Sequence, residues 1–339
     1  MAENSVETEE LVNYNKRLRQ ILLVLAMAML LYLGLTFWAG FDRLWGAVRL
    51  FPLSSLILIF VLILVGWGLR ALRWLYYSVH LKWEIPHLPN TLIFLSSFAF
   101  TATPGKAGEV VKSVLLHSRY GISISESAGV LLIERLQDLL AVLVLSAGGL
   151  VIFVDAWWYL LICSMMIFSL VLFIIYEPLH RGVFTFFSRI SRLAPLMKKF
   201  NELLQTGKVL FQPLPFLVGF ILALFAWTGE ALALHWLFVG FKQEIPLFTS
   251  FFIYGLSTLI GALSMLPGGV GGFEAAMLFL LKTLHIPSTI AIASTVLIRA
   301  LTLWALSILG MFFMFLWEVF LKNHSLTTIK KGLSFEEKK

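Results

Sequence analysis

The chain has 339 residues, of which 59% are hydrophobic and only 13% are charged. Soluble globular domains have roughly 45 to 50% apolar and about 25% charged residues, so this composition excludes a soluble enzyme or binding domain. The net charge of +7 lies mainly in loops and tails beside apolar segments, a pattern typical of membrane surfaces and not of nucleic-acid binding. We therefore predict an all-α integral membrane protein with a single membrane domain over 1–339 and no nucleic-acid partner.

Six apolar segments reach the length of about 20 residues that a helix needs to cross a bilayer. The first, 21–40, follows three basic residues as a signal peptide does, but it exceeds the usual apolar region of roughly 7 to 15 residues and lacks a clear cleavage site. We expect it to be retained as a span. The other five predicted spans are 52–77, 126–153, 156–176, 213–240 and 288–320.

Two further apolar segments contain breaks. Segment 88–117 is interrupted by Pro104-Gly105, and segment 247–283 by the glycine-rich run 267–272, so each half is nearer to half a bilayer than to a whole one. Broken helices at membrane depth need surrounding protein or water for their freed backbone groups. We predict two re-entrant helical hairpins; a pair of ordinary spans with a proline kink remains the alternative for each.

The distribution of basic residues predicts the orientation. Segment 177–212 contains six Lys and Arg residues and only two Glu residues, which favours the cytoplasmic side. With six spans and two hairpins that do not cross, both tails fall on that same side. We therefore expect a multi-pass protein of the cell membrane with cytoplasmic N- and C-termini.

An internal repeat recurs at an offset of 160 to 164 residues. Lys82-Trp83-Glu84-Ile85-Pro86 recurs as Lys242-Gln243-Glu244-Ile245-Pro246, and later matches follow in the same order, with Arg135 matching Arg299. Three predicted spans precede the span that opens the second copy, and an odd number inverts it, as in many secondary transporters. The predicted division is 1–51 (tail and first span), 52–153 (repeat 1), 154–212 (extra span and basic linker), 213–320 (repeat 2) and 321–339 (tail).

Ionisable residues within the predicted membrane segments are the candidates for function. A charge at the bilayer centre costs about 2.5 to 3.5 kcal/mol on insertion scales, so such residues must face protein, water or a polar ligand. Arg70, Arg73 and Glu230 occupy the spans that open the two copies. The candidates for substrate binding are Lys106, Glu109, Lys112, Arg135, Asp138, Glu274 and Arg299.

The breaks add backbone groups to this set. A half-helix that begins after Pro104-Gly105 or Pro267-Gly268-Gly269 would present free N–H groups and a positive dipole end to an anion. We expect a lipid phosphate there, held by charge-assisted bonds from Lys106, Arg135 and Arg299. The alternative is structural, with Arg135 and Asp138 as an intrahelical pair and Arg299 and Glu274 as an interhelical clamp; the two interpretations are compatible.

Other chemistry lacks support in the sequence. The glycine-rich run has no Gly-Lys-Ser/Thr ending of a nucleotide loop, the histidines are scattered, and no serine lies in a nucleophile elbow. The single cysteine, Cys163, has no partner for an intrachain disulfide. We expect no metal, no cofactor and no enzymatic activity.

Three motifs resemble those of a known family. They are Phe100-Thr101-Ala102-Thr103-Pro104-Gly105-Lys106-Ala107-Gly108-Glu109, Glu134-Arg135-Leu136-Gln137-Asp138 and Leu266-Pro267-Gly268-Gly269-Val270-Gly271-Gly272-Phe273-Glu274. Over roughly 20–320 the chain resembles the lysylphosphatidylglycerol synthase transmembrane family, the flippase-like domain also found in multiple peptide resistance factors. About twenty polar residues follow the last span, so the resemblance implies a stand-alone member without the aminoacyltransferase domain.

The resemblance implies lipid translocation between leaflets. We expect a flippase or scramblase for a phosphate-bearing lipid of anionic, aminoacylated or polyprenyl type, with membrane lipids as partners. A secondary transporter of a water-soluble anion, and an envelope-lipid assembly factor or membrane-embedded enzyme, are the alternatives. The sequence leaves open the headgroup, the direction and energy source of transport, and whether the chain forms a homo-oligomer.

Overall fold

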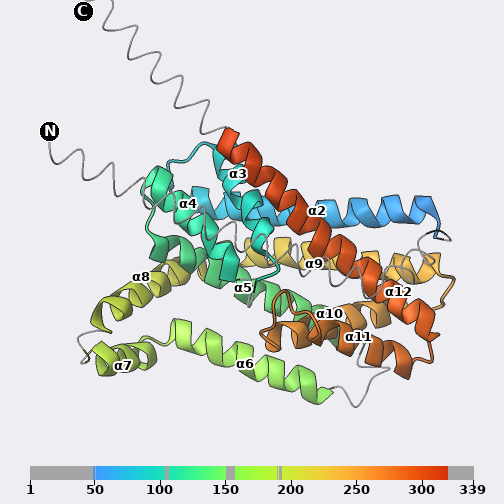
Figure 1. Ribbon diagram of the computed structural model, residues 1–339. Helices are drawn as coiled ribbons and strands as arrows, with labels where there is room; N and C mark the ends of the chain where they lie inside the picture. The colour runs from blue at the N-terminus through green and yellow to red at the C-terminus, as the bar shows by residue number, and fades with distance from the viewer. Residues whose placement is uncertain are drawn as a thin grey trace, which may run out of the picture. The chain divides into compact units, whose positions relative to one another are not determined.

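Long apolar stretches without an internal proline form the principal helices (Figure 1). The computed structural model describes residues 49, 51–103, 107–149, 157–188, 190 and 193–319, and this part of the chain is all-α, without strands. The first predicted span, 21–40, lies outside the described residues. The helices are α2 (Leu53–His80), α3 (His87–Ser97), α4 (Val111–Tyr120), α5 (Ile124–Ala147), α6 (Trp157–Ile175), α7 (Glu177–Ser188), α8 (Ala194–Leu210), α9 (Pro213–Gly240), α10 (Leu247–Leu263), α11 (Gly272–Thr283) and α12 (Ser288–Arg299).

Four helices in the described part are long and apolar enough to cross a membrane. They are α2, α6, α9 and the helix Ser288–Val319, in which α12 continues through a π-helical segment at Ala300–Trp304. These four correspond to predicted spans. The predicted span 126–153 is helical as α5, but its charged residues keep it outside this apolar group.

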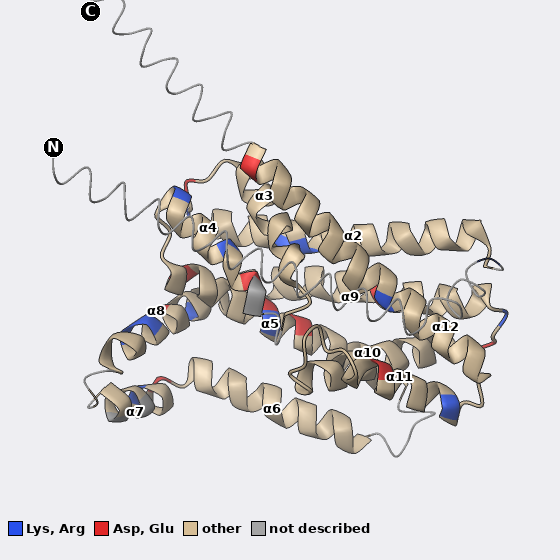
Figure 2. Cartoon of the chain, viewed as in Figure 1, with Lys and Arg blue, Asp and Glu red and all other residues tan. Residues whose placement is uncertain are grey.

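The charges of α5 are turned into the protein. Figure 2 shows basic and acidic residues gathered along α5 and neighbouring helices, whereas α6 carries none. α5 packs against α8, α9 and α10, and its Leu136 joins a buried cluster with Ile167, Ile174 and Leu204. A helix surrounded in this way can carry ionisable side chains that lipid would not tolerate.

Helices end on either side of both predicted breaks, of which Pro104-Gly105 itself lies outside the described residues. α3 ends in a 3₁₀ turn at Phe98–Phe100, and a second 3₁₀ turn, Ala107–Val110, leads into α4. The chain between α10 and α11 runs through 264–271 without helix, where Gly268 and Gly269 have positive φ values of 62° and 68°. A side chain on Gly268 would also come within 3.3 Å of the Ala102 Cα, so only glycine suits this approach.

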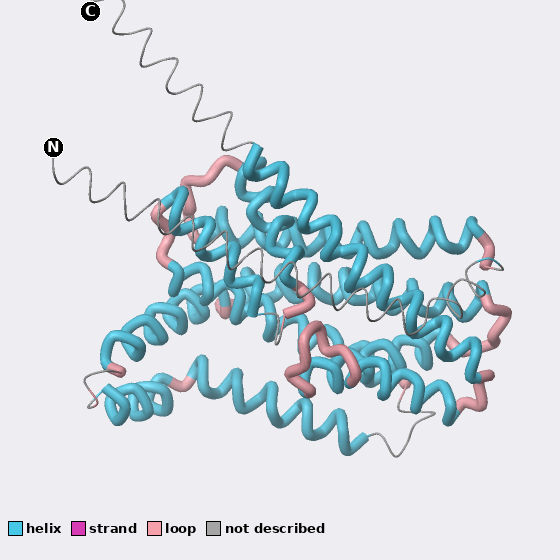
Figure 3. Tube along the Cα trace, viewed as in Figure 1, coloured by secondary structure: helices cyan, strands magenta, loops and turns pink. Residues whose placement is uncertain are grey.

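The two loops meet each other. Figure 3 shows the α10–α11 loop near the turn at 101–103, and the Gly268 N–H donates to the Thr103 carbonyl at 3.5 Å. α3 packs against α4, and α10 packs against α11. With 11 residues, α3 spans about 16 Å at 1.5 Å per residue, well short of a hydrocarbon core of about 30 Å.

The same helix ending closes α2 and α9, 160 residues apart, and it recurs at the end of α11, where His285 has a φ of 57° and the Ile286 N–H donates to the Leu281 carbonyl. Lys82 and Lys242 both adopt the left-handed conformation, with φ values of 57° and 56°. The following N–H groups bond back identically, from Trp83 to the Ser78 carbonyl and from Gln243 to the Phe238 carbonyl. α2 and α9 each have 28 residues and each is followed, after this turn, by a proline-capped helix.

α2 and α9 cross at close range. A Cβ on Gly66 would lie 3.0 Å from the Ala226 carbonyl oxygen, and one on Gly229 would lie 2.9 Å from the Leu62 carbonyl oxygen. The absence of side chains lets the two backbones approach, as small residues do between membrane helices. The close contact holds α2 and α9, the first helices of segments 52–153 and 213–320, against each other.

Candidate functional site

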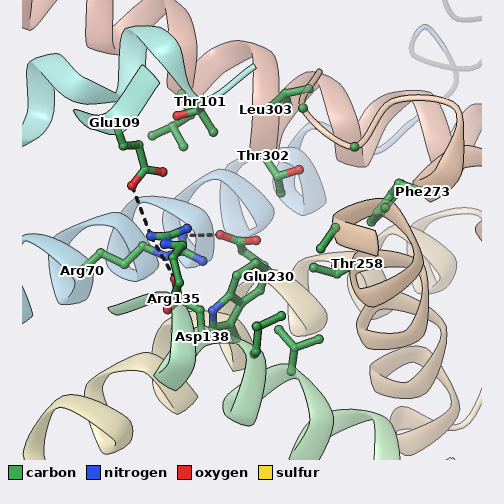
Figure 4. Close-up of a pocket in the computed structure, with 18 of the residues that line it drawn as sticks. Arg70, Thr101, Glu109, Arg135, Asp138, Glu230, Thr258, Phe273, Thr302 and Leu303 are labelled. Carbon is green, nitrogen blue, oxygen red and sulfur yellow. Dashed lines mark hydrogen bonds and ion pairs between the residues drawn. The ribbon is translucent and has the colours of Figure 1, made fainter. Parts of the chain in front are cut away.

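A cavity of about 320 Å³ lies among α2, α5, α9, α10, α12 and the segments that follow α3 and α10. Its volume is at the lower end of the range of roughly 300 to 1,000 Å³ for small-molecule sites. Figure 4 shows ion pairs at the cavity, between Arg70 and Glu230 and between Arg135 and Glu109. Among the described residues, four arginines and four acids line it: Arg70, Arg73, Arg135, Arg299, Glu109, Glu134, Asp138 and Glu230.

Arg135 is the basic group most open to this cavity. Its side chain is 28% exposed, and its Nη2 lies 3.3 Å from Glu109 and 3.1 Å from Asp138. These separations exceed the 2.7 to 2.9 Å of a short charge-assisted hydrogen bond. Within the described part of the chain, the Arg135 Nε has no hydrogen-bond partner. Arg135 can therefore exchange its contacts for an anionic ligand.

A second basic group, Lys112, is held behind the cavity. Its Nζ donates to the Glu134 carboxylate at 2.7 Å and lies over the Trp74 ring, 4.2 Å from its centroid. Arg73 approaches Glu134 at 3.8 Å and donates to Asp138 at 2.9 Å. Lys112 and Glu134 are fully buried, so this network positions α5 against α4 and α2.

Arg70 and Glu230 form an ion pair between α2 and α9. Tyr254 from α10 donates to the other carboxylate oxygen of Glu230, and the Arg70 guanidinium lies 4.7 Å from the Trp227 ring centroid. The charged groups of Arg70 and Glu230 are almost completely shielded from solvent. Such a buried pair is maintained only when further hydrogen bonds satisfy its members, as Tyr254 does here.

Arg299 joins α12 to α11 and to the α10–α11 loop. Its Nε donates to Glu274 at 2.8 Å and its Nη2 to the Gly268 carbonyl at 2.7 Å. Glu274 also accepts a bond from the Gly271 N–H at 2.7 Å, at the start of α11. Glu274 therefore caps its helix and pairs with an arginine, and this pair is the interhelical clamp that the sequence offers as the structural alternative.

The remaining lining combines acceptors with an apolar rim. Thr101, Thr258 and Thr302 each donate their hydroxyl proton to a carbonyl of their own backbone segment, so their oxygen lone pairs remain to accept bonds. At another edge of the cavity Met265 is 66% exposed and Leu266 is 48% exposed. The cavity thus connects buried arginines to exposed apolar side chains.

Residues at the repeat offset line the cavity in pairs. Arg70 and Glu230 are 160 positions apart. α5 and the α12 helix contribute residues 164 positions apart to the lining. At the 160 offset these pairs also include Phe94 with Tyr254, Phe98 with Thr258 and Thr101 with Gly261; at the 164 offset they are Arg135 with Arg299, Asp138 with Thr302, Leu139 with Leu303 and Val142 with Leu306.

The predicted substrate-binding residues fall into three groups. Glu109, Arg135, Asp138, Gly268, Gly269 and Arg299 line the cavity. Three others lie next to the lining. Glu274 accepts a bond from Arg299, which lines the cavity, Pro267 belongs to the adjoining loop, and Lys112 lies behind Glu134. Pro104, Gly105 and Lys106 lie outside the described residues.

Sequence reasoning left several lining residues out of the predicted site. Arg70, Arg73 and Glu230 are candidates for function because they are ionisable residues in predicted spans, but the predicted substrate-binding set does not include them. Glu134 carries the same signal, because it is an acid within the predicted span 126–153, whereas Tyr254, a tyrosine in an apolar segment, carries none. In the described ranges no group of His, Cys, Asp and Glu side chains is arranged to hold a metal ion.

Comparisons with known proteins cover most of the chain. The family profile described as lysylphosphatidylglycerol synthase TM region matches residues 21–310. A UPF0104 membrane protein of Methanothermobacter thermautotrophicus is 25% identical over 313 residues, which are 85% of this chain and 91% of that protein. UPF0104 membrane protein MJ1078 of Methanocaldococcus jannaschii is 24% identical over 224 residues, covering 63% of this chain and 91% of the relative.

Proposed function

Because this chain belongs to the lysylphosphatidylglycerol synthase transmembrane family, we propose that it is a flippase or scramblase that moves a phosphate-bearing lipid between leaflets. The observation that carries the proposal is the cavity, in which a partly exposed Arg135 and an exposed apolar rim share one space. A phospholipid joins an anionic headgroup to apolar chains. In this cavity Arg135 would bind the headgroup and the apolar rim would contact the chains.

The headgroup phosphate would bind at Arg135. The four arginines and four acids that line the described part of the cavity balance each other, so a phosphate must replace a carboxylate at one of the arginines. Arg135 is suited to this exchange because both of its ion-pair contacts are long. Arg70 and Arg73 are already committed to Glu230 and Asp138.

The acyl chains would lie along the apolar rim. Met265 and Leu266 belong to the loop that closes the second hairpin, and both are exposed while lining the cavity. Exposed apolar side chains in a membrane protein face lipid at no cost, whereas a pore for a water-soluble anion would have polar edges. The rim therefore favours a lipid over a free anion.

The proposed transport uses the inverted repeat. We propose six spans, two re-entrant hairpins and cytoplasmic termini, with 52–153 and 213–320 as inverted copies around the cavity. The cavity lining, whose residues pair at offsets of 160 and 164 positions, supports this arrangement. In this scheme the chain carries lipid without chemical conversion and is not an enzyme.

Reconstitution in liposomes tests the function. We expect the purified protein to accelerate the exchange of fluorescent anionic phospholipids between leaflets, measured by the loss of fluorescence on adding dithionite outside. Arg135→Ala should slow this exchange by about tenfold or more, since a hydrogen bond to a charged group contributes about 1.5 to 3 kcal/mol. Arg299→Ala should slow it as well, because the second hairpin loses its anchor.

Arg181→Ala is the matched control. Arg181 is 72% exposed and pairs with Glu177 on α7, away from the cavity lining, so the exchange rate should not change. Wild-type rates equal to those of empty vesicles for all headgroups would contradict lipid transport. Release of entrapped glycerol phosphate without lipid exchange would instead identify a transporter of water-soluble anions.

A further inference from the structure

Two Arg–Glu pairs occupy equivalent positions in the proposed repeats. Arg135 and Arg299 are 164 positions apart, and their partners, Glu109 and Glu274, are 165 apart. In each pair the arginine comes from the last long helix of its copy, and the glutamate follows the break in its hairpin. Both arginines line the same cavity.

The two Arg–Glu pairs differ in the distance between the guanidinium and the carboxylate and in the exposure of the arginine. The Arg299 Nε donates to Glu274 at 2.8 Å, and the Nη2 of the same residue bonds to the Gly268 carbonyl at 2.7 Å. The equivalent Nε of Arg135 has no partner within the described residues, and the Arg135 Nη2 lies 3.3 Å from Glu109. The Arg299 side chain is 11% exposed, against 28% for Arg135.

We propose that these pairs are two alternating phosphate half-sites, each closed by its own glutamate when the other is open. This inference rests on the proposed lipid transport and its inverted repeat. In the present conformation Glu274 holds Arg299 closed, and Arg135 is available to the phosphate. After the two copies exchange conformations, Glu109 closes on Arg135 and Arg299 receives the phosphate on the other side of the membrane.

The exchange between the two conformations depends on a difference in how the phosphate binds at Arg135 and at Arg299. A phosphate can shift the equilibrium between the two conformations only if it binds one better than the other. At Arg135 it competes with two long contacts, whereas at Arg299 it competes with two short ones. Glu109 and Glu274 are therefore positioning residues that determine which arginine is free.

Side-specific labelling of a cavity cysteine tests the alternation without requiring lipid transport. Cys163 is the only cysteine of the chain, so Cys163→Ala with Leu139→Cys leaves one reporter on the cavity wall. A membrane-impermeant maleimide is added to intact cells and, separately, to inside-out vesicles. Glu274→Gln should change the ratio of the two labelling rates by about fivefold, corresponding to about 1 kcal/mol, and Glu109→Gln should change it in the opposite direction.

Further variants decide between gating and general damage. Glu177→Gln removes an equal charge from the exposed pair with Arg181 and should leave the ratio unchanged. Glu109→Asp and Glu274→Asp keep the negative charge but shorten the side chain, so they serve if the Gln variants do not fold. Each should shift the ratio of labelling rates in the direction expected of its Gln variant, by a smaller factor. Shifts in the same direction, or no shift in either pair of variants, would overturn the alternation even if lipid exchange is observed.

Discussion

Glu134 has no exposed surface, and two basic side chains hold it. Lys112 contributes the short bond at 2.7 Å, while Arg73 remains 3.8 Å away. The Lys112 ammonium also lies over the rings of Trp74 and Phe94, with centroids at 4.2 and 5.0 Å. Such a site is paired so completely that removing one partner leaves an uncompensated buried charge.

Lys112→Met should therefore destabilise the protein strongly. We expect the free energy of unfolding in detergent micelles to fall by about 3 kcal/mol or more, because Glu134 keeps only the distant Arg73. Arg181→Met, which breaks an exposed ion pair, should change it by less than about 1 kcal/mol. Adding Glu134→Gln to Lys112→Met should recover part of the loss; equal losses for Lys112→Met and Arg181→Met would show that the pair does not contribute as its burial implies.

The crossing of α2 and α9 belongs to the scale of whole elements. Both helices are apolar around most of their surface, so their sequences alone do not indicate which face meets the other helix. Gly66 and Gly229 mark that face, because each lies against a backbone carbonyl of the opposite helix. Gly68 on the same helix has nothing within 4 Å and marks an open face.

Gly66→Val and Gly68→Val provide a matched pair at this crossing. The change in helix propensity is the same, but only the Gly66 side chain must displace a backbone atom of α9. We expect Gly66→Val to lower the melting temperature in micelles, with a loss of about 1 to 3 kcal/mol from overpacking, and Gly68→Val to leave it nearly unchanged. Similar melting temperatures for the two variants would argue against close contact at Gly66.

Arg70 and Glu230 connect the two halves of the described molecule. They occupy the same position in α2 and α9, 160 residues apart, so the ion pair lies where the axis relating the proposed copies would pass. Tyr254 gives the pair its asymmetry, since its repeat counterpart, Phe94, has no hydroxyl group.

A charge swap tests this relation at the scale of the whole molecule. Arg70→Glu alone and Glu230→Arg alone should each lower the melting temperature, because each places like charges together inside the protein. The double variant Arg70→Glu/Glu230→Arg should recover most of the loss, with a remainder from the Tyr254 hydroxyl. A double variant no more stable than either single variant would contradict an interchangeable pair.

The sequence by itself determined the class of fold, four of its six predicted spans, the glycine-rich break between α10 and α11 and the burial of the charges in the described part, because apolar length and proline-glycine breaks act locally. It also offered, as the structural alternative to phosphate binding, the Arg135–Asp138 and Arg299–Glu274 pairs, whose members lie on one helix or on neighbouring helices. Tertiary structure alone decided that Lys112 faces Glu134 and not the cavity, and that Arg70 meets Glu230. Those partners come from distant parts of the chain, and only packing selects among several buried charges of suitable sign.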